Sequence, residues 1–208
     1  MCPRYFFKTK DDLICRPSNF KLQISNLELY YIAIVVPEPL QSEITAFKTD
    51  IHQRFGAKSA LKSPAHITLF PPFRWESTDE NALKMALNEF SLEYFQKRGL
   101  LSIKLKNFGF FRKSTVFIQP ESNENLNLMR LELLNYLSKH INLRDEKDAA
   151  RPYHPHITLV NRDISEADFE IIWDEYANRT FSGQFVVDGI ALLKKGELKW
   201  DTIHIIRF

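Results

Sequence analysis

The chain of 208 residues is poor in cysteine, in net charge and in long apolar runs. Its two cysteines, Cys2 and Cys15, both lie in the N-terminal segment without the spacing of a metal or redox motif, so we expect reduced thiols. No stretch approaches the length of a membrane span, and the N-terminal residues lack the continuous apolar region of a signal peptide. These absences predict a soluble cytoplasmic protein without membrane association.

The net charge is only +2, which does not indicate a sequence-independent grip on long nucleic acid. Local basic clusters could still hold a phosphate or a nucleotide end. Three common catalytic patterns are also missing: the glycine-rich phosphate loop of the Walker type, the G-x-S-x-G nucleophile elbow and the H-E-x-x-H zinc motif. We therefore expect no cofactor.

Two of the six histidines begin the same tetrapeptide, His-Ile-Thr-Leu, at His66–Leu69 and at His156–Leu159. Average residue frequencies give a second copy by chance only roughly once in several hundred cases. In a strand, residues two apart share a face, so each H-x-T copy presents an imidazole beside a hydroxyl while the isoleucine and leucine point into a core. Such a pair can lie on a solvated strand face without any function, but its duplication favours a functional site.

Hydrophobic periodicity predicts the order strand, helix, motif strand, helix and strand in the first half of the chain, and the second half repeats this order. The predicted strands cover residues 29–36, 66–70, 100–111, 114–119, 156–160, 183–193 and 199–208. The predicted helices cover residues 39–55, 77–95, 124–141 and 165–178. Gly56 and Gly99 are expected to end the first two, and Ser165 with Asp168 forms a capping start for the last one. The sequence PPFRW at residues 71–75 is predicted to be a turn, and residues 1–27 an irregular extension or a covering strand.

The longer repeat predicts how the elements are arranged in space. Residues 28–208 are expected to form a single bilobal domain of the α+β class, with internal repeats at about 28–112 and 113–208. Each lobe would be an antiparallel or mixed sheet with outer helices. Because the two HITL copies occupy equivalent places, a pseudo-twofold axis would bring them together at an active-site cleft between the lobes.

Two imidazoles on opposite walls suit a reaction that needs a base on one side of the reacting atom and an acid on the other. Phosphoryl transfer is such a reaction, because the attacking and leaving oxygens lie roughly in line through phosphorus. Histidine has an ordinary pKa of about 6.5, so both protonation states are accessible, and threonine hydroxyls can donate hydrogen bonds to the non-bridging oxygens. No metal is then required. The symmetric motif does not distinguish the acid from the base.

The paired H-I-T-L strands, the first followed by FPPF and the second preceded by HP and followed by an arginine, resemble those of the 2H phosphoesterases. The 2′-5′ RNA ligase-like branch is the most similar, and the resemblance covers residues 29–208. It implies a bilobal fold and metal-independent action on cyclic phosphate or 2′-5′ phosphodiester linkages. It also implies catalysis by His66 and His156, with Thr68 and Thr158 holding the phosphate.

Residues beside the motifs are candidates for substrate binding. Arg162 stands where many members of this family have an arginine shortly after the second motif. Phe73 and Tyr153 lie in proline-bounded turns beside the motifs, where a ring could stack on a base. The sequence departs from the family pattern at Phe117, where tryptophan is common, and at Thr115, where arginine is. These two departures concern base recognition and substrate size.

We expect a hydrolase that acts as a metal-independent phosphodiesterase on a 2′,3′-cyclic phosphate, at an RNA end or on a small nucleotide. The same histidine pair could run the reverse reaction, 2′-5′ RNA ligation, by microscopic reversibility. Two alternatives stay open: a non-catalytic module that binds RNA ends or nucleotides, and the opening of a cyclic phosphate in an ADP-ribose derivative. Beyond the substrate we expect no metal and no membrane partner, and we expect a monomer.

Overall fold

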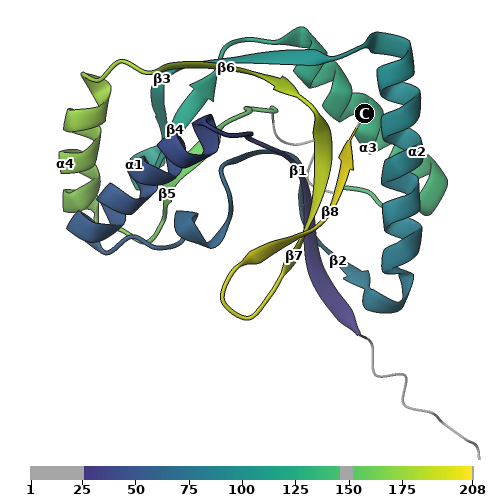
Figure 1. Cartoon of the computed structure of the whole chain (residues 1–208). Helices are drawn as coiled ribbons and strands as arrows, with labels where there is room; N and C mark the ends of the chain where they lie inside the picture. Colours follow the sequence, from purple (N-terminus) through teal and green to yellow (C-terminus); the bar gives the residue numbers. More distant parts are fainter. Residues whose placement is uncertain (1–25, 146–151, 208) are drawn as a thin grey trace, which may run out of the picture.

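The computed structural model describes residues 26–145 and 152–207. Over these ranges the chain forms eight strands and four α-helices, arranged as two four-stranded sheets with helices beside them (Figure 1). This is the α+β class that the sequence predicts. None of these helices combines the length and the apolarity that crossing a membrane would need. Apart from Asn26 and Leu27, the predicted N-terminal extension lies outside the described residues.

Among the described residues, every strand pairing in the two sheets is antiparallel. The sheet that carries the first motif has the strand order β2-β1-β7-β8, with the bounds His66–Glu76, Leu27–Val35, Gly189–Lys195 and Trp200–Arg207. The sheet that carries the second motif has the order β5-β4-β3-β6, with the bounds Ile157–Asn161, Thr115–Pro120, Leu101–Phe111 and Ser182–Val187. Both motif strands, β2 and β5, are therefore edge strands with a single neighbour in their sheets.

Two helices accompany each sheet. Helices α2 (Glu80–Arg98) and α3 (Glu124–Ile141) lie with the first-motif sheet, where α2 contacts β7 and β8 and α3 contacts β2. Helices α1 (Leu40–Phe55) and α4 (Glu166–Ala177) lie with the second-motif sheet, through contacts with β5 and β3. We call the first group of elements the His66 lobe and the second group the His156 lobe.

One hydrophobic core runs through both lobes. It includes fully buried residues from each sheet, among them Ile32 and Ile67 in the His66 lobe and Ile118 and Ile157 in the His156 lobe. Burial of an aliphatic side chain of this size stabilises the fold by about 1.5–3 kcal/mol. The lobes therefore share one core and are held together by it.

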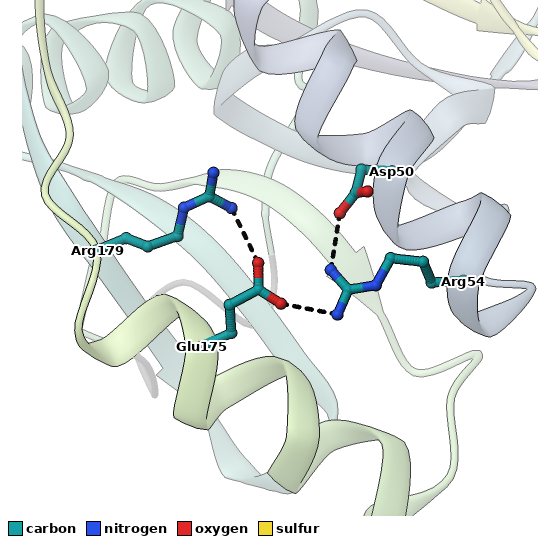
Figure 2. Close-up of polar contacts among 4 residues, drawn as sticks. All are labelled: Asp50, Arg54, Glu175 and Arg179. Carbon is teal, nitrogen blue, oxygen red and sulfur yellow. Dashed lines mark hydrogen bonds and ion pairs between the residues drawn. The ribbon is translucent and has the colours of Figure 1, made fainter.

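Helix α1 packs against α4 within the His156 lobe. Phe47 of α1 meets Tyr176 of α4 edge-on, with the ring centroids 6.1 Å apart. Figure 2 shows the polar contacts beside it, where Arg54 of α1 bonds to Glu175 of α4 at 2.8 Å and Arg179 bonds to the other oxygen of the same carboxylate at 3.2 Å. Exposed ion pairs contribute only about 0–1 kcal/mol each. The aromatic packing is therefore the larger contribution to this contact.

The lobes do not follow the predicted division of the chain near residue 112. Strand β3 precedes that point but lies in the His156 lobe, while β7 and β8 follow it and lie in the His66 lobe. Helices α1 and α3 are exchanged in the same way. Each half of the chain thus gives elements to both lobes, and the repeats at about 28–112 and 113–208 stay a prediction about the sequence.

The predicted turn at residues 71–75 is wrong, because β2 continues through it to Glu76. Its two prolines cannot donate main-chain hydrogen bonds, but an edge strand leaves one side unpaired, and proline is tolerated there. The pairing with β1 also shifts its register at this point, between Tyr30 and Ile32. The prolines are therefore accommodated within a long, irregular edge strand.

The predicted strand at residues 183–193 is divided in two. Strand β6 ends at Val187 in one sheet, and after Asp188 alone the chain enters β7 at Gly189 in the other sheet. Gly189 is required there because a Cβ at this position would overlap the main-chain oxygen of Ile206. The apolar residues 185–187 and 190–193 are separated only by Asp188 and Gly189, so the hydrophobic pattern gives little sign of the division.

The four predicted helices are confirmed, with small changes at their ends. Helix α4 has the predicted cap, in which the hydroxyl of Ser165 accepts from the N–H of Asp168 at 3.1 Å. Helices α1 and α2 end at the predicted glycines, Gly56 and Gly99, which both have a φ of 73°. Helix α2 starts later than predicted because residues 77–79 form a separate 3-10 turn.

Gly189→Ala should lower the free energy of unfolding by about 1–3 kcal/mol, because the added Cβ meets main chain that cannot move without disturbing β8. Gly183→Ala is the matched control in β6, the preceding strand along the chain. There the nearest atoms are methyl groups of Leu40, which can rotate away, so we expect a change below about 1 kcal/mol. Urea unfolding followed by circular dichroism measures both variants. Equal losses of stability would contradict this account of Gly189.

Candidate active site

The two motif strands lie side by side, although they belong to different sheets. Strand β2 contacts β5, and the hydroxyl of Tyr153, just before the second motif, donates to the main-chain oxygen of Thr68 at 3.0 Å. A charge on His156 is also close enough to lower the pKa of His66. The structure therefore brings the two HITL copies together.

The side chains of each motif alternate between the core and the opposite face. Ile67, Leu69 and Ile157 have none of their surface exposed, and Leu159 has 1 % exposed. The histidines and threonines between them stay partly exposed. The predicted alternation is thus present in both copies, and it leaves two imidazoles and two hydroxyls on the face away from the core.

Each imidazole is oriented by the carbonyl two residues before it. Nδ1 of His66 lies 2.8 Å from the oxygen of Pro64, and Nδ1 of His156 lies 2.7 Å from the oxygen of His154. Because a carbonyl oxygen can only accept, this geometry assigns the proton of each neutral ring to Nδ1. Nε2 is then left to accept a proton or, in the charged ring, to donate one.

Burial lowers the pKa of both imidazoles. For His66 the pKa falls to about 4, mainly through desolvation; the Pro64 carbonyl opposes the shift, and the nearby charges of Lys48 and His156 add to it. For His156 desolvation again dominates, and the carbonyl of His154 opposes it. Both rings are therefore neutral at pH 7 before an anion binds, so the resting site can accept protons on either side.

Aromatic rings flank each imidazole. The ring of Tyr31 on β1 lies 4.9 Å from that of His66, and Trp200 on β8 meets Tyr31 edge-on at 4.6 Å. On the other side, Phe111 at the end of β3 lies perpendicular to His156 at 4.9 Å. Such rings desolvate the imidazoles and offer flat apolar surfaces of the kind on which nucleobases stack.

The side chains at this site suit an oxyanion. Each HITL copy offers a histidine Nε2 and a threonine hydroxyl, which can both donate to phosphate oxygens when the ring is charged. Within the described ranges, no three or more His, Cys, Asp or Glu side chains are grouped so that they could hold a metal ion. Three hollows on the described surface are lined by residues outside both motifs, so the cleft at the motifs stays a prediction.

The two-lobed arrangement has counterparts among known proteins. A family model described as the 2′-5′ RNA ligase superfamily matches residues 36–198. The chain belongs to this superfamily of 2H phosphoesterases. A comparison with curated proteins finds no match.

Several solved structures are similar to this 2H phosphoesterase. LigT of E. coli, complexed with 3′-AMP, has a TM-score of 0.59 at 18% identity, over 88% of this chain and 98% of LigT. The protein TT0787 of Thermus thermophilus has a TM-score of 0.55 at 17% identity, over 86% and 97% of the two chains. A structure described as a phosphoesterase has a TM-score of 0.51 at 20% identity, over 87% and 95%. At these identities the likeness establishes the bilobal fold.

The predicted substrate-binding residues of the 2H phosphoesterase lie in three different settings. Tyr153 lies between the motif strands, with its hydroxyl bonded to the main chain of Thr68. Arg162 is exposed just beyond the end of β5. Phe73 packs against the core, with its ring centroid 5.1 Å from that of Phe70. The structure therefore does not bring Phe73 together with the two imidazoles.

The two departures from the family pattern lie on β4, next to the second motif. Phe117 pairs in register with Thr158, and its ring lies 5.4 Å from that of His156. The ring also covers Gly109, where a Cβ would come within 2.6 Å of it. Thr115 is buried. Phe117 therefore shapes the wall beside the imidazole, whereas Thr115 pairs with Asn161 at the other end of β5.

Sequence reasoning missed several residues around the first imidazole. Lys48 is 3 % exposed and lies on the buried stripe of α1 between Ile44 and Ile51, so its helical spacing was a usable signal. Tyr31 alternates along β1 with core residues, which also places it on the motif face. Trp200 had no such signal, because its position depends on how β7 and β8 pair.

A bound oxyanion should raise the pKa of both motif histidines, and sulfate is a suitable probe because it stays ionised where histidine titrates. We expect saturating sulfate to raise the pKa of His66 and of His156 by about one unit or more, since an opposite charge nearby typically shifts a pKa by about 1–3 units. NMR titration of the ring protons measures this. His204, which bonds to Asn88 on α2, is the internal control. A motif histidine whose pKa ignores sulfate would contradict a shared anion site.

Proposed function

We propose that the protein is a metal-independent phosphodiesterase that opens 2′,3′-cyclic phosphates. The observation that carries the proposal is the pair of imidazoles on adjacent edge strands. Each has its Nδ1 bonded to a carbonyl two residues earlier, so each leaves Nε2 available for proton transfer. Membership of the 2′-5′ RNA ligase superfamily supports the same class of reaction.

Two proton transfers accompany the proposed hydrolysis. Nε2 of one histidine takes a proton from water as the water oxygen attacks phosphorus, and the bond from phosphorus to one ribose oxygen breaks on the opposite side. The other histidine donates its Nε2 proton to the departing oxygen, which leaves a ribose hydroxyl and a phosphomonoester. The hydroxyls of Thr68 and Thr158 donate to the non-bridging oxygens and stabilise the charge that develops there.

The substrate itself supplies the charge that this scheme needs. Both imidazoles are neutral at rest because their pKa values are lowered. A negatively charged phosphodiester favours the protonated ring, so one histidine takes up the proton that it later donates. The other stays neutral, because two imidazolium ions side by side repel each other. One acid and one base thus form when the substrate binds.

A nucleotide substrate fits the aromatic surroundings. Solved LigT structures contain 3′-AMP in one case and phosphate in another. In this chain the ring of Tyr31 lies beside His66, with Trp200 against Tyr31, and the ring of Phe111 lies beside His156; a stacked base is worth about 1–3 kcal/mol. Arg162 is our candidate for a further phosphate contact. We therefore propose a cyclic nucleotide or a cyclic-phosphate RNA end as substrate, with 2′-5′ ligation where a free 5′-hydroxyl attacks phosphorus in place of water and the ribose 3′-oxygen departs with the proton.

A substrate panel tests the proposal. It contains 2′,3′-cyclic nucleotides, short RNAs that end in a cyclic phosphate, 2′-5′-linked dinucleotides and an ADP-ribose cyclic phosphate, each with and without EDTA. We expect cyclic phosphates to be opened at the same rate in EDTA, because the imidazoles carry out both proton transfers. Phosphorus NMR of the products identifies the broken bond. Loss of turnover in EDTA would contradict the metal-independent scheme, and binding without conversion would favour a non-catalytic module.

His66→Ala and His156→Ala should each lower kcat by about 10²- to 10⁴-fold, because each removes the group for one proton transfer. The double variant should lose little more than either single variant, since both groups act in one step. His204→Ala is the control for loss of a histidine elsewhere. Steady-state kinetics on the best panel substrate measures all four. Nearly wild-type activity in either single motif variant would exclude the two-histidine mechanism.

A further inference from the structure

The loop of residues 57–65 orients His66, because the carbonyl of Pro64 binds the ring of His66 and the carbonyl of Ala65 ties the end of the loop to the residue after β1. The oxygen of Pro64 accepts from Nδ1 of His66 at 2.8 Å. The oxygen of Ala65 accepts from the N–H of Val36 at 2.9 Å. Whatever holds this loop in place therefore also directs the first imidazole.

Asp163 reaches the start of this loop from the other lobe. It lies two residues beyond β5, and its Oδ2 accepts from the N–H of Lys58 at 2.8 Å and from the N–H of Ser59 at 2.6 Å. Burial opposes the ionisation of Asp163, yet the N–H groups of Lys58 and Ser59, the hydroxyl of Ser59 and the N–H of Asp163 itself together outweigh burial and lower the pKa of the carboxyl. Hydrogen bonds to a charged acceptor are among the stronger ones in proteins.

The turn between β5 and Asp163 has an unusual backbone. Arg162 has a φ of 62°, in the left-handed region that residues other than glycine rarely adopt. Its N–H donates to the oxygen of Ser114 at 2.8 Å. Such conformations cost about 1–3 kcal/mol and persist only where the surroundings impose them. The surrounding structure therefore holds this turn in a fixed conformation. The turn places Asp163 next to the loop of residues 57–65.

Helix α1, which also belongs to the His156 lobe, holds the rest of the loop. Nζ of Lys48 donates to the oxygens of Ala60 and Ser63, both at 3.2 Å. Oε1 of Gln41 accepts from the N–H of Ala65 at 2.6 Å. The helix is fixed in that lobe by its packing on α4, beside the ion pairs of Figure 2. The side chains that hold the loop of the first histidine thus come from the lobe of the second.

We propose that Asp163 is a positioning residue for His66 and sets the distance between the two imidazoles across the lobes. The segment from His156 to Asp163 carries the second imidazole at one end and the anchor of the first imidazole at the other. Catalytic groups need to be held within about 0.5 Å of their working positions, and a displacement of about 1 Å can cost roughly 100-fold in rate. The expected effect on turnover rests on the proposed function, whereas the effect on the ring of His66 does not.

Asp163→Ala in the full chain removes the acceptor, and Asp163→Asn is the rescue variant because an amide oxygen can still accept from both N–H groups. We expect Asp163→Ala to lower kcat about 10- to 100-fold while KM changes by less than about threefold. Asp163→Asn should recover most of the loss. Asp188→Ala is the matched control, since it removes an exposed carboxylate between β6 and β7, and it should leave kcat and KM unchanged.

Nitrogen-15 NMR of the ring of His66 gives a readout that needs no turnover. In the wild type Nδ1 carries the proton of the neutral ring. In Asp163→Ala we expect a mixture of both tautomers, because the carbonyl of Pro64 no longer stays in place, while His204 should not change. If the wild type opens no cyclic phosphate, the proposed function fails, and the NMR result still decides the role of Asp163.

Ser59→Pro is a second variant in case Asp163→Ala does not fold. The φ of Ser59 is −62°, which proline adopts without strain, so the change deletes both the N–H and the hydroxyl that Ser59 donates to Asp163 and keeps Asp163 itself. We expect a kcat lower by about 3- to 10-fold and the same change at His66. Wild-type kcat with an unaltered tautomer of His66 would overturn the proposal. A lower kcat with an unaltered tautomer would overturn it too, because Asp163 would then act elsewhere.

Discussion

A single hydrophobic core lies behind both motif strands, and it determines which way the two histidines face. Ile67 and Ile157 are fully buried in it. Since successive side chains of a strand point to opposite faces, burying the isoleucines directs the imidazoles to the opposite face. A slip of one residue would bury the histidine and threonine of a motif and expose its isoleucine and leucine. The orientation of the polar site is therefore a consequence of apolar packing on its far side.

The exchange of elements between the lobes has a mechanical consequence. A chain folded as two successive lobes would join them through one linker, and their relative position would depend on their interface. Here α1, β3, α3, β7 and β8 each lie with strands from the other half of the chain. The chain crosses between the lobes repeatedly, within a shared core. Two imidazoles supplied by separate sheets can therefore keep a constant separation, which acid–base catalysis at one phosphorus atom requires.

Local chemistry explains what the sequence could predict. The period of two in HITL, the capping start at Ser165 and the glycine ends of α1 and α2 each depend on neighbouring residues, and the structure confirms them. The prolines of β2 led to the wrong prediction of a turn. Proline is tolerated in a strand at a sheet edge, and the sequence does not show which strands lie at an edge because that depends on how the strands pair. The same holds for the passage from β6 to β7, where the chain changes sheet at Asp188 within a largely apolar stretch.

The surroundings of the site depended on contacts far apart in the chain. Asp163 meets Lys58 and Ser59 across more than a hundred residues, and no local pattern marks a carboxylate for such a contact. Trp200 reaches the first imidazole only through Tyr31, after β8 has paired with β7 and β7 with β1. The histidine pair that we propose to be catalytic was therefore visible in the sequence, while the residues that we propose orient it and flank it were not.

Lys48 both holds the loop that precedes His66 and affects the charge state of that histidine. Desolvation lowers the pKa of this lysine to about 8, so it remains mostly charged at pH 7, and its charge is one of the causes that keep His66 neutral. The field that disfavours a second cation favours an anion, so the same ammonium assists the binding of a phosphate. His156 instead faces Phe111 and Phe117. Two identical tetrapeptides thus lie in unequal surroundings, and we propose that this inequality lets one imidazole accept a proton while the other gives one up.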